Sequence, residues 1–336
     1  SPSKSELFIR IKMRILIILP NWLGDAIMAT PAIELLSEYH PDAKFTFVGS
    51  YVSIEALKHH PKCERAIVDE TKKAANRFIA TYKLAQELGA FHLAVTFRNQ
   101  LHSSLLLRFT NTVVCLAKQS WHSMFLLSHT PRIKAGKHLV LQYAQLAMTD
   151  VDNYSNNIGA LKLYIEPQEF TKPTLGINAG ATYGSAKRWY PERFAQVASE
   201  FSDKFDIIIF GGPGEVEMAK EIEDNLISLN THNFINLAGK TNIEELCSNI
   251  AGCSLFITND SGPMHVAAAY QVPTVAIFGP TKHKETSQWM NQKSKIVREE
   301  MECAPCMKRE CPLKHHECMK NITASKVIEA VKDLGF

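Results

Sequence analysis

Polar side chains that can act on a phosphorylated ligand follow several apolar runs of this 336-residue chain. The first is Asp25, at the end of the loop 20–25 (PNWLGD), which follows the apolar residues 13–19. An aspartate at the start of a helix often caps the first turn, and the local pattern favours that interpretation. Its carboxylate can also face a cleft and act as a general base. The loop lacks the GxGxxG spacing of a dinucleotide-binding site.

The loop 178–191 (NAGATYGSAKRWYP) carries residue types that suit a phosphate group. Thr182 can donate a hydrogen bond, and Lys187 can provide a positive point charge. A flexible connection without a ligand is the alternative interpretation. Further along, the residues 211–214 (GGPG) precede Glu215, which can hold a ribose hydroxyl as acids do in nucleotide-binding folds. Gly-Pro-Gly also starts helices that bind nothing, so Glu215 by itself does not establish a site.

The segment 259–265 (NDSGPMH) predicts an anion site at the N-terminus of a helix. There the N–H groups of Ser261 and Gly262 carry partial positive charge and suit a pyrophosphate. Asp260 can cap this helix or orient a hydroxyl group or a metal ion, and His265 faces either the core or the ligand. Several such loops at one cleft predict a nucleotide-linked donor that binds mainly to the second half of the chain.

Two successive series of alternating strands and helices are predicted to position these loops. The first half is predicted to form strands at 13–19, 44–49, 65–68, 91–97 and 112–116, and helices at 26–39, 73–88, 101–109 and 138–148. The second half is predicted to form strands at 174–178, 206–210, 234–236, 254–258 and 274–278, and helices at 191–201, 214–227, 243–250, 263–270 and 323–334. The fold class is therefore α/β, with two doubly wound, Rossmann-like domains that face an interdomain cleft.

The domain boundaries follow from the break in this alternation. The first domain is expected at 13–160 and the second at 171–320, joined through the polar, glycine- and proline-containing residues 150–170. The remaining residues 321–336 contain an amphipathic helix, which we expect to pack back on the first domain. No apolar run approaches the roughly 18 residues of a membrane-spanning helix.

The charge of the chain is unevenly distributed. Hydrophobic residues make up 46% and charged residues 21%, which excludes a disordered or disulfide-stapled chain. Between residues 71 and 140, one acid, Glu87, accompanies ten basic residues, so this segment carries +9 against a net charge of +3 for the whole chain. The basic residues are Lys72, Lys73, Arg77, Lys83, Arg98, Arg108, Lys118, Arg132, Lys134 and Lys137. Such asymmetry indicates an anionic partner or a solvated basic face, and no nucleic-acid-binding motif accompanies it.

Four of the eight cysteines lie close together near the end of the chain. Cys303, Cys306, Cys311 and Cys318 have the spacing C-x2-C-x4-C-x6-C, with His315 and His316 between them. Four thiols at this spacing can hold a structural zinc ion, although the second pair lacks the short spacing of a zinc knuckle. Reduced thiols that pack a loop, or disulfides formed after purification, are the alternatives.

Three segments together resemble the lipopolysaccharide heptosyltransferases of glycosyltransferase family 9. They are residues 19–32 (LPNWLGDAIMATPA), residues 187–191 (KRWYP), and residues 258–265 (TNDSGPMH) with 278–281 (FGPT). The resemblance covers nearly the whole chain from Met13. It implies the GT-B fold and an inverting single displacement that moves L-glycero-D-manno-heptose from ADP-heptose to the first heptose of the lipopolysaccharide inner core. The first domain would bind the acceptor and the second would bind the donor.

The resemblance also implies roles for individual residues. Asp25 falls at the position of the proposed catalytic base, which replaces the local preference for a helix cap. Arg98, just beyond a predicted strand, is our acceptor contact. The donor contacts implied by the resemblance are Thr182, Lys187, Glu215, Thr241, Asp260, Ser261, Gly262 and His265.

The expected partners are ADP-heptose and the lipid A-linked inner-core oligosaccharide, with no nucleic acid. The basic segment 71–140 would face this anionic acceptor and the cytoplasmic leaflet of the inner membrane, so we expect a cytoplasmic, peripherally attached protein. The chemistry requires no cofactor, and stimulation by a divalent cation such as Mg²⁺ remains open. The alternatives are transfer to Kdo as in a heptosyltransferase of the first type, an epimerase of the GT-B fold, and a nucleotide or nucleic-acid binder without catalysis.

Overall fold

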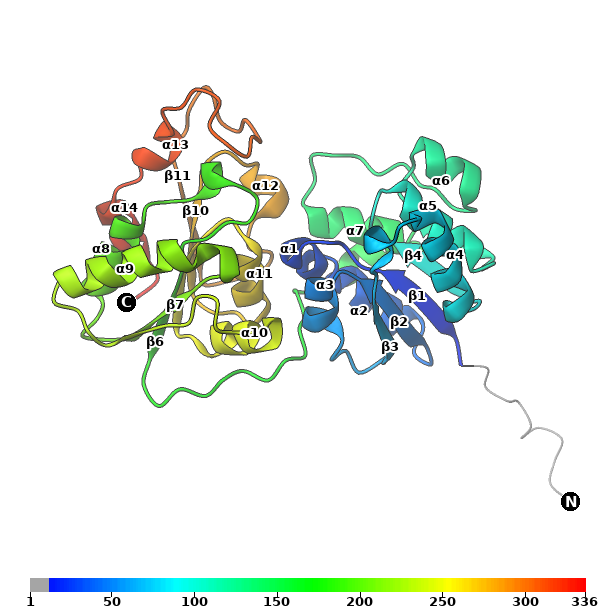
Figure 1. Cartoon of the computed structure of the whole chain (residues 1–336), viewed down its shortest axis with the longest axis horizontal. Helices are drawn as coiled ribbons and strands as arrows, with labels where there is room; N and C mark the ends of the chain where they lie inside the picture. Colours follow the sequence, from blue (N-terminus) through cyan, green and yellow to red (C-terminus); the bar gives the residue numbers. More distant parts are fainter. Residues whose placement is uncertain (1–11) are drawn as a thin grey trace, which may run out of the picture.

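The computed structural model describes residues 12–336, which form two α/β lobes side by side (Figure 1). The first lobe has a parallel sheet with the strand order β3-β2-β1-β4-β5. Its strands are β1 (Arg14–Ile18), β2 (Lys44–Gly49), β3 (Cys63–Val68), β4 (Leu93–Thr96) and β5 (Val114–Ala117). Its helices are α1 (Leu23–Met28), α2 (Thr30–Tyr39), α3 (Tyr51–Leu57), α4 (Arg77–Leu88), α5 (Leu101–Phe109), α6 (Trp121–Leu126) and α7 (Leu139–Ala147).

The second lobe has a parallel sheet with the strand order β11-β10-β9-β6-β7-β8. Its strands are β6 (Thr174–Asn178), β7 (Asp206–Phe210), β8 (Phe234–Asn236), β9 (Leu255–Asn259), β10 (Thr274–Phe278) and β11 (Ser294–Arg298). Its helices are α8 (Pro191–Glu200), α9 (Val216–Ser228), α10 (Ile243–Gly252), α11 (Gly262–Ala269), α12 (His283–Thr286), α13 (Glu317–Lys320) and α14 (Ala324–Asp333).

The sequence explains why these central segments are strands. The residues of β1 from Ile15 to Ile18 are fully buried, as are most residues of β6, β9 and β10. Continuous apolar runs of this length are typical of parallel strands that are covered by helices on both faces. The two doubly wound domains that the alternation predicts are therefore confirmed.

Two central strands of each sheet mark the point where the strand order reverses. In the first lobe these strands are β1 and β4, and in the second they are β6 and β9. The loops after such a pair diverge to opposite faces of the sheet and leave a crevice between them. The loops that carry most of the candidate residues begin at these points.

One buried apolar cluster continues from the first lobe into the second. It includes Ile17 and Ile27 of the first lobe together with Ile250, Phe256 and Val266 of the second. The helices that meet across the boundary are α1 with α11 and α3 with α10. The two lobes therefore share a packed apolar interface near the candidate site.

The C-terminal helix differs from expectation. We expected residues 321–336 to pack back on the first domain, but α14 packs on α8, β10 and β11 of the second (Figure 1). The apolar face of α14 explains this placement, because Val327 and Val331 are fully buried in the same cluster as Phe194 of α8. The Phe336 ring also contacts the Phe205 ring, with 5.6 Å between their centroids.

The linker is fixed to both domains by hydrogen bonds. The Lys162 backbone N–H donates to the Thr30 hydroxyl of α2 over 3.0 Å. The Tyr270 hydroxyl, after α11, donates to the Ile165 carbonyl over 2.6 Å. The connection between the domains thus follows the interface.

Candidate active site

Two helix N-termini meet where the domains face each other, and glycine permits their close approach. A β-carbon on Gly24 of α1 would lie 2.9 Å from the Cδ2 atom of His265 in α11. A β-carbon on Gly262 would lie 3.1 Å from the Leu23 side chain. Real β-carbons do not approach this closely without displacement of a neighbour, so small residues are required at this crossing. The contact brings Asp25, one residue after Gly24, to the second domain.

Asp25 lies within electrostatic reach of two residues of the second domain. Burial raises the pKa of the Asp25 carboxyl above its ordinary value, the Lys187 ammonium lowers it, and the Asp260 carboxylate raises it. The N-cap position of α1 is Trp22, and no side chain makes a capping hydrogen bond there. Asp25 is therefore not a helix cap, and its carboxylate faces charged groups across the domain boundary.

Lys187 and Asp260 form an ion pair that is largely buried. The Lys187 Nζ atom lies 3.0 Å from the Asp260 Oδ2 atom, and the Thr281 hydroxyl donates to the same oxygen over 2.6 Å. The Lys187 ammonium also lies over the Tyr183 ring, 4.7 Å from its centroid. This ion pair thus connects the loop after β6 to the residues that precede α11, at the point where the strand order of the second sheet reverses.

The N-terminus of α11 retains the features of an anion site. Ser261 occupies its N-cap position without a capping hydrogen bond from its side chain. Its hydroxyl instead accepts a hydrogen bond from the Asn178 side chain over 3.2 Å. The first N–H groups of α11 therefore remain available to an external acceptor, with the partial positive charge of the helix behind them.

Asn259 fixes the neighbouring loop. Its side-chain Oδ1 accepts a hydrogen bond from the Trp189 N–H over 3.0 Å, and its Nδ2 donates to the Ala179 carbonyl. Because Asn259 is fully buried, these bonds hold the post-β6 loop beside the start of α11.

His265 is buried directly behind the crossing of α1 and α11. Its pKa is lowered to about 4, mainly by burial; the Asp260 carboxylate opposes this shift, and His138 and Lys187 contribute to it. Its Nδ1 atom has no hydrogen-bond partner among residues 12–336. A neutral ring therefore packs against Gly24 at neutral pH, and His265 faces the interface rather than open solvent.

The remaining predicted donor contacts lie around the same edge of the second sheet. The Glu215 side chain covers Gly180, where a β-carbon would lie 1.9 Å from its carboxyl carbon, and its Oε2 accepts from the Gly212 N–H over 3.0 Å. Thr182 is exposed in the post-β6 loop. Thr241 is half-buried between β8 and α10. The structure thus brings Asp25, Lys187, Asp260, Ser261, Gly262 and His265 together, with Thr182, Glu215 and Thr241 on the loops around them.

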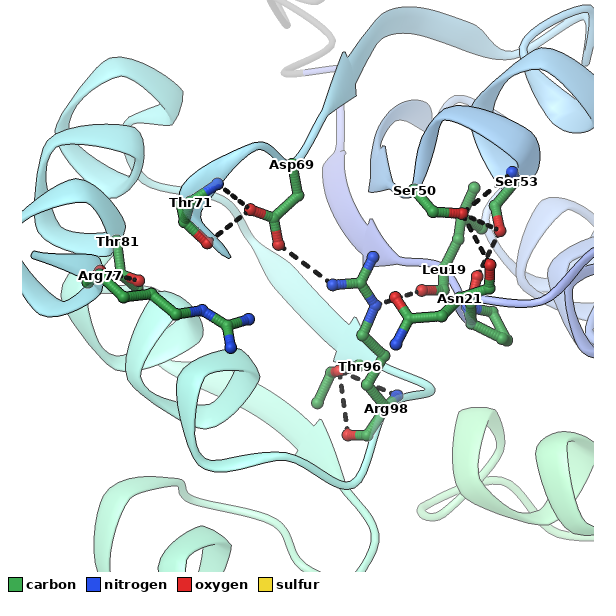
Figure 2. A network of polar contacts seen from close by, with 11 residues as sticks. Leu19, Asn21, Ser50, Ser53, Asp69, Thr71, Arg77, Thr81, Thr96 and Arg98 are labelled. Atoms are coloured by element: carbon green, nitrogen blue, oxygen red, sulfur yellow. Dashed lines mark hydrogen bonds and ion pairs between the residues drawn. The ribbon is translucent and has the colours of Figure 1, made fainter. Parts of the chain in front are cut away.

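Arg98 lies at the reversal point of the first sheet, and two of its three side-chain nitrogen atoms are hydrogen-bonded (Figure 2). Its Nε donates to the Leu19 carbonyl over 2.7 Å, and its Nη1 donates to the Asp69 carboxylate over 3.1 Å. Burial lowers the pKa of the Arg98 guanidinium, and Asp69 opposes this shift. Arg98 is therefore a buried residue of the first domain whose Nη2 amino group has no partner among residues 12–336, and its role as an acceptor contact stays a prediction.

Three side chains hold the loop that leads to Asp25 by its carbonyl oxygens (Figure 2). Arg98 donates to Leu19, the Ser53 hydroxyl of α3 donates to Pro20, and the Ser50 hydroxyl donates to Asn21 over 2.8 Å. Three consecutive backbone groups are thus fixed by partners from two other segments. Such fixation keeps a catalytic side chain in one geometry.

Sequence reasoning missed two residues that surround this site. Thr281 belongs to the segment 278–281, which is part of the family resemblance, so the sequence indicates that this segment matters. Its hydrogen bond to Asp260 could not be predicted from the sequence. Tyr143 of α7 is close enough for Asp25 to raise its pKa, after burial has raised it well above its ordinary value. No local pattern in α7 signals this proximity, because it depends on how α7 packs beside α1.

The cysteines form no metal site in the described structure. Cys303, Cys306, Cys311 and Cys318 line one cavity together with His315 and His316, and all four are free thiols. Within residues 12–336, no three His, Cys, Asp or Glu side chains are arranged to hold a metal ion. The donor types suit zinc, and zinc binding stays a prediction.

No helix within residues 12–336 is long and apolar enough to cross a membrane.

Comparison with known proteins gives consistent matches. The sequence profile described as glycosyltransferase family 9 (heptosyltransferase) matches residues 81–317. Lipooligosaccharide heptosyltransferase 2 of Campylobacter jejuni subsp. jejuni serotype O:2 is 41% identical over 331 residues, which cover 96% of this chain and 98% of that protein.

Two solved structures share the fold. The structure of Escherichia coli ADP-heptose LPS heptosyltransferase II superposes with a TM-score of 0.81 at 24% identity, covering 96% of this chain and 98% of that one. The structure of Escherichia coli heptosyltransferase WaaC with ADP superposes with a TM-score of 0.76 at 18% identity, covering 96% of this chain and 100% of that one. These superpositions confirm the GT-B architecture expected from the sequence.

Proposed function

The chain belongs to glycosyltransferase family 9, the heptosyltransferases, and from this premise we propose how its residues carry out the transfer. Its relatives named heptosyltransferase 2 support the assignment to the second heptose-addition step. The proposed reaction moves L-glycero-D-manno-heptose from ADP-heptose to the first heptose of the lipopolysaccharide inner core. ADP leaves, and the anomeric carbon is inverted in a single displacement.

Asp25 is the proposed general base. It accepts the proton of the acceptor hydroxyl while that oxygen forms its bond to the anomeric carbon. The bond from the anomeric carbon to the β-phosphate oxygen breaks at the same time, and its electron pair leaves with ADP. One carboxylate suffices for this step, because no covalent sugar–enzyme intermediate has to form or be resolved. The raised pKa of the buried Asp25 carboxyl increases its proton affinity.

Lys187 and the start of α11 are the proposed anion contacts of the departing ADP. Lys187 can exchange its contact with Asp260, now 3.0 Å away, for a phosphate oxygen. The uncapped N–H groups at Ser261 and Gly262 can donate to the diphosphate. Fixed positive groups that meet charge as it develops lower the barrier to bond cleavage. Thr182, Glu215 and Thr241 on the surrounding loops are the proposed contacts to the remaining phosphate, ribose and adenine groups.

The first domain is proposed to bind the acceptor. Its basic segment 71–140 carries +9, which suits the phosphates and carboxylates of the inner core and an anionic membrane surface. Peripheral attachment to the cytoplasmic leaflet would bring the enzyme to its lipid-linked acceptor. The chemistry as proposed requires no cofactor, because Lys187 and α11 provide the positive charge. Added Mg²⁺ is a variable to test in the assay.

The observation that carries this proposal is the position of Asp25 of the first domain opposite Lys187 and Asp260 of the second. The test is to incubate the protein with ADP-heptose and monoheptosylated Kdo-lipid A and to weigh the lipid product. Addition of one heptose, with release of ADP, is the expected result. An unchanged acceptor, or an epimerised free sugar without transfer, would contradict the proposed reaction.

A further inference from the structure

Three nitrogen atoms of the first domain are buried without a hydrogen-bond partner among residues 12–336. They are Arg98 Nη2, Arg77 Nε and His102 Nδ1. The side chain of Arg98 is only 5% exposed, so its free amino group cannot be satisfied by bulk water. Buried polar groups are nearly always paired in folded proteins, and three orphans in one region indicate a missing partner.

The three residues come from separate segments that meet at the carboxyl edge of the first sheet. Arg98 follows β4, Arg77 is the first residue of α4, and His102 lies in the first turn of α5. They are close enough to interact electrostatically, because Arg77 lowers the pKa of both Arg98 and His102. Figure 2 shows the Arg77 side chain extending toward the Arg98 guanidinium on the side where Asp69 lies.

The charges around this cluster are not balanced. Asp69 is the acid that interacts with it, and its Oδ1 already accepts two hydrogen bonds from Thr71 while its Oδ2 accepts from Arg98. Burial would raise the pKa of Asp69, but the bonds from Thr71 and the charge of Arg98 lower it below its ordinary value. The Asp69 carboxylate thus pairs with Arg98, and the positive charge of Arg77 nearby has no such acid paired with it among residues 12–336. Glu87, the single acid of segment 71–140, lies near the other end of α4, about 15 Å along the helix from Arg77.

The cluster adjoins the loop that carries the proposed base. Arg98 donates through Nε to the Leu19 carbonyl, six residues before Asp25. A ligand bound to the free Nη2 of Arg98 would therefore lie next to the first residues of this loop. It would lie on the domain that is proposed to bind the acceptor. Guanidinium groups form strong, charged hydrogen bonds to carboxylates and phosphates. The free Nη2 atom of Arg98 and the free Nε atom of Arg77 can each donate one such bond.

We infer that Arg77, Arg98 and His102 form a subsite for an oxyanion, a carboxylate or phosphate, of the acceptor saccharide. This inference rests on the proposed function and names the chemical group that the first domain recognises. In it, Arg98 anchors the anion, Arg77 closes the subsite at its half-exposed rim, and His102 supplies a further ring nitrogen. Anion binding thereby fixes the acceptor relative to the loop that ends at Asp25.

Arg77→Gln is the sharpest variant, because Arg77 is half-exposed and makes none of the bonds that hold the loop. Loss of Arg98 would also release Leu19 and Asp69, so folding and binding effects would mix. The acceptor is the inner-core saccharide of monoheptosylated Kdo-lipid A, released from its lipid so that membrane attachment does not contribute. Arg77→Gln is expected to raise the KM for this acceptor roughly ten-fold or more, the size of a lost charged hydrogen bond. The affinity for ADP, measured by calorimetry, should stay as in the wild type.

Arg108→Ala is the charge-matched control, since Arg108 is exposed in the last turn of α5, about 9 Å along the helix from His102. It should raise the KM for the acceptor less than about two-fold, and His102→Gln should raise it more than Arg108→Ala does. Two modified acceptors, one with amidated carboxyl groups and one without phosphates, identify the recognised group. The effect of Arg77→Gln should vanish with one of them.

Four outcomes decide the inference. A wild-type KM in Arg77→Gln, or an equal loss in Arg108→Ala, would overturn the subsite while the transfer reaction itself stands. An effect that persists with both modified acceptors would overturn it as well, because no anion would then be involved. Absence of transfer by the wild type would instead overturn the proposed function, and the subsite with it.

Discussion

A single carboxylate connects the two domains electrostatically, and its surroundings set its properties. Burial raises the pKa of Asp25, and Lys187 and Asp260 act on it with opposite signs. Lys187 is shared between the two acids, since it already contacts Asp260. A donor diphosphate that draws Lys187 away would raise the proton affinity of Asp25 further. On the proposed mechanism, donor binding therefore prepares the base.

Acid sensitivity is predicted for His265. Its pKa is lowered to about 4 by burial, while the same group in the unfolded chain titrates near 6.5. Between these two pH values the unfolded state binds more protons than the folded state. The contribution of His265 to the free energy of unfolding is therefore complete above pH 6.5 and decreases as the pH falls toward 4. His265→Gln removes this contribution.

The measurement is chemical denaturation of wild type and His265→Gln at pH 7 and pH 5. On going from pH 7 to pH 5, the wild type should lose more of its free energy of unfolding than His265→Gln does. Equal losses in both proteins would show that His265 does not stay neutral in the fold. His232→Gln, at an exposed position of the second domain, is the matched control.

Residue roles were only partly predictable from the sequence. The position of Asp25 after β1 was visible, yet the local pattern favoured a helix cap, and the structure places Trp22 at that position. The bonds of Arg98 to Leu19 and Asp69 join segments 79 and 29 residues apart, so no local pattern could indicate them. The role of Asp25 as base remains a prediction.

At the level of elements, the crossing of α1 and α11 controls the site. Gly24→Ala is predicted to push the two helices apart, because the added β-carbon would lie 2.9 Å from His265 Cδ2. A displacement of Asp25 by even about 1 Å can cost on the order of 100-fold in rate. We expect kcat for transfer to fall by at least ten-fold.

Gly159→Ala is the matched control, since nothing lies within 4 Å of its added β-carbon. Its kcat should remain within about two-fold of the wild type. A Gly24→Ala enzyme with full kcat would show that the close crossing is not needed to place Asp25.

Buried strands were the most predictable elements, and exposed or short ones were not. The apolar runs of β1, β6 and β10 each correspond to an observed strand, because burial on both faces requires apolar residues throughout. The edge strand β11 was missed, since its residues are half-exposed and include Lys295 and Arg298. The short helices α3 and α6 were also missed, because six or seven residues give too few turns for a clear period.

At the scale of the whole molecule, the apolar cluster shared by both domains holds the site together. Cross-domain hydrogen bonds add to it, as from the His138 ring to the Ser287 carbonyl over 2.8 Å and from Trp289 Nε1 to the Gly159 carbonyl over 2.9 Å. The sequence predicted two domains and a cleft, but it placed α14 on the wrong domain. An amphipathic helix shows which face is buried and not which surface covers it.

ADP is predicted to stabilise the whole protein through Lys187. A ligand at 100 times its Kd adds about 2.7 kcal/mol to the free energy of unfolding. For domains of this size, that corresponds to a rise in Tm of roughly 5–10 °C. Lys187→Ala should lose most of this increment, because its ammonium is the proposed phosphate contact.

The rise in Tm on addition of ADP must be compared, and not Tm itself. Loss of Lys187 removes an ion-pair partner of the buried Asp260, which keeps its hydrogen bond from Thr281, so the variant is expected to be less stable even without ADP. Differential scanning calorimetry with and without ADP gives both values. Lys204→Ala, at an exposed position of the same domain, should keep the full rise. An undiminished rise in Lys187→Ala would remove this lysine from the donor site.

The most direct test of the account is the comparison of Asp25→Asn with the wild type in two measurements on the same samples. Asparagine keeps the shape of the side chain and cannot accept the proton, so transfer should fall by roughly 10²–10⁴-fold. The calorimetric affinity for ADP should remain close to that of the wild type, because the nucleotide binds to the second domain. Transfer at a near wild-type rate, or a parallel loss of ADP binding, would contradict a base presented by one domain to a donor held by the other.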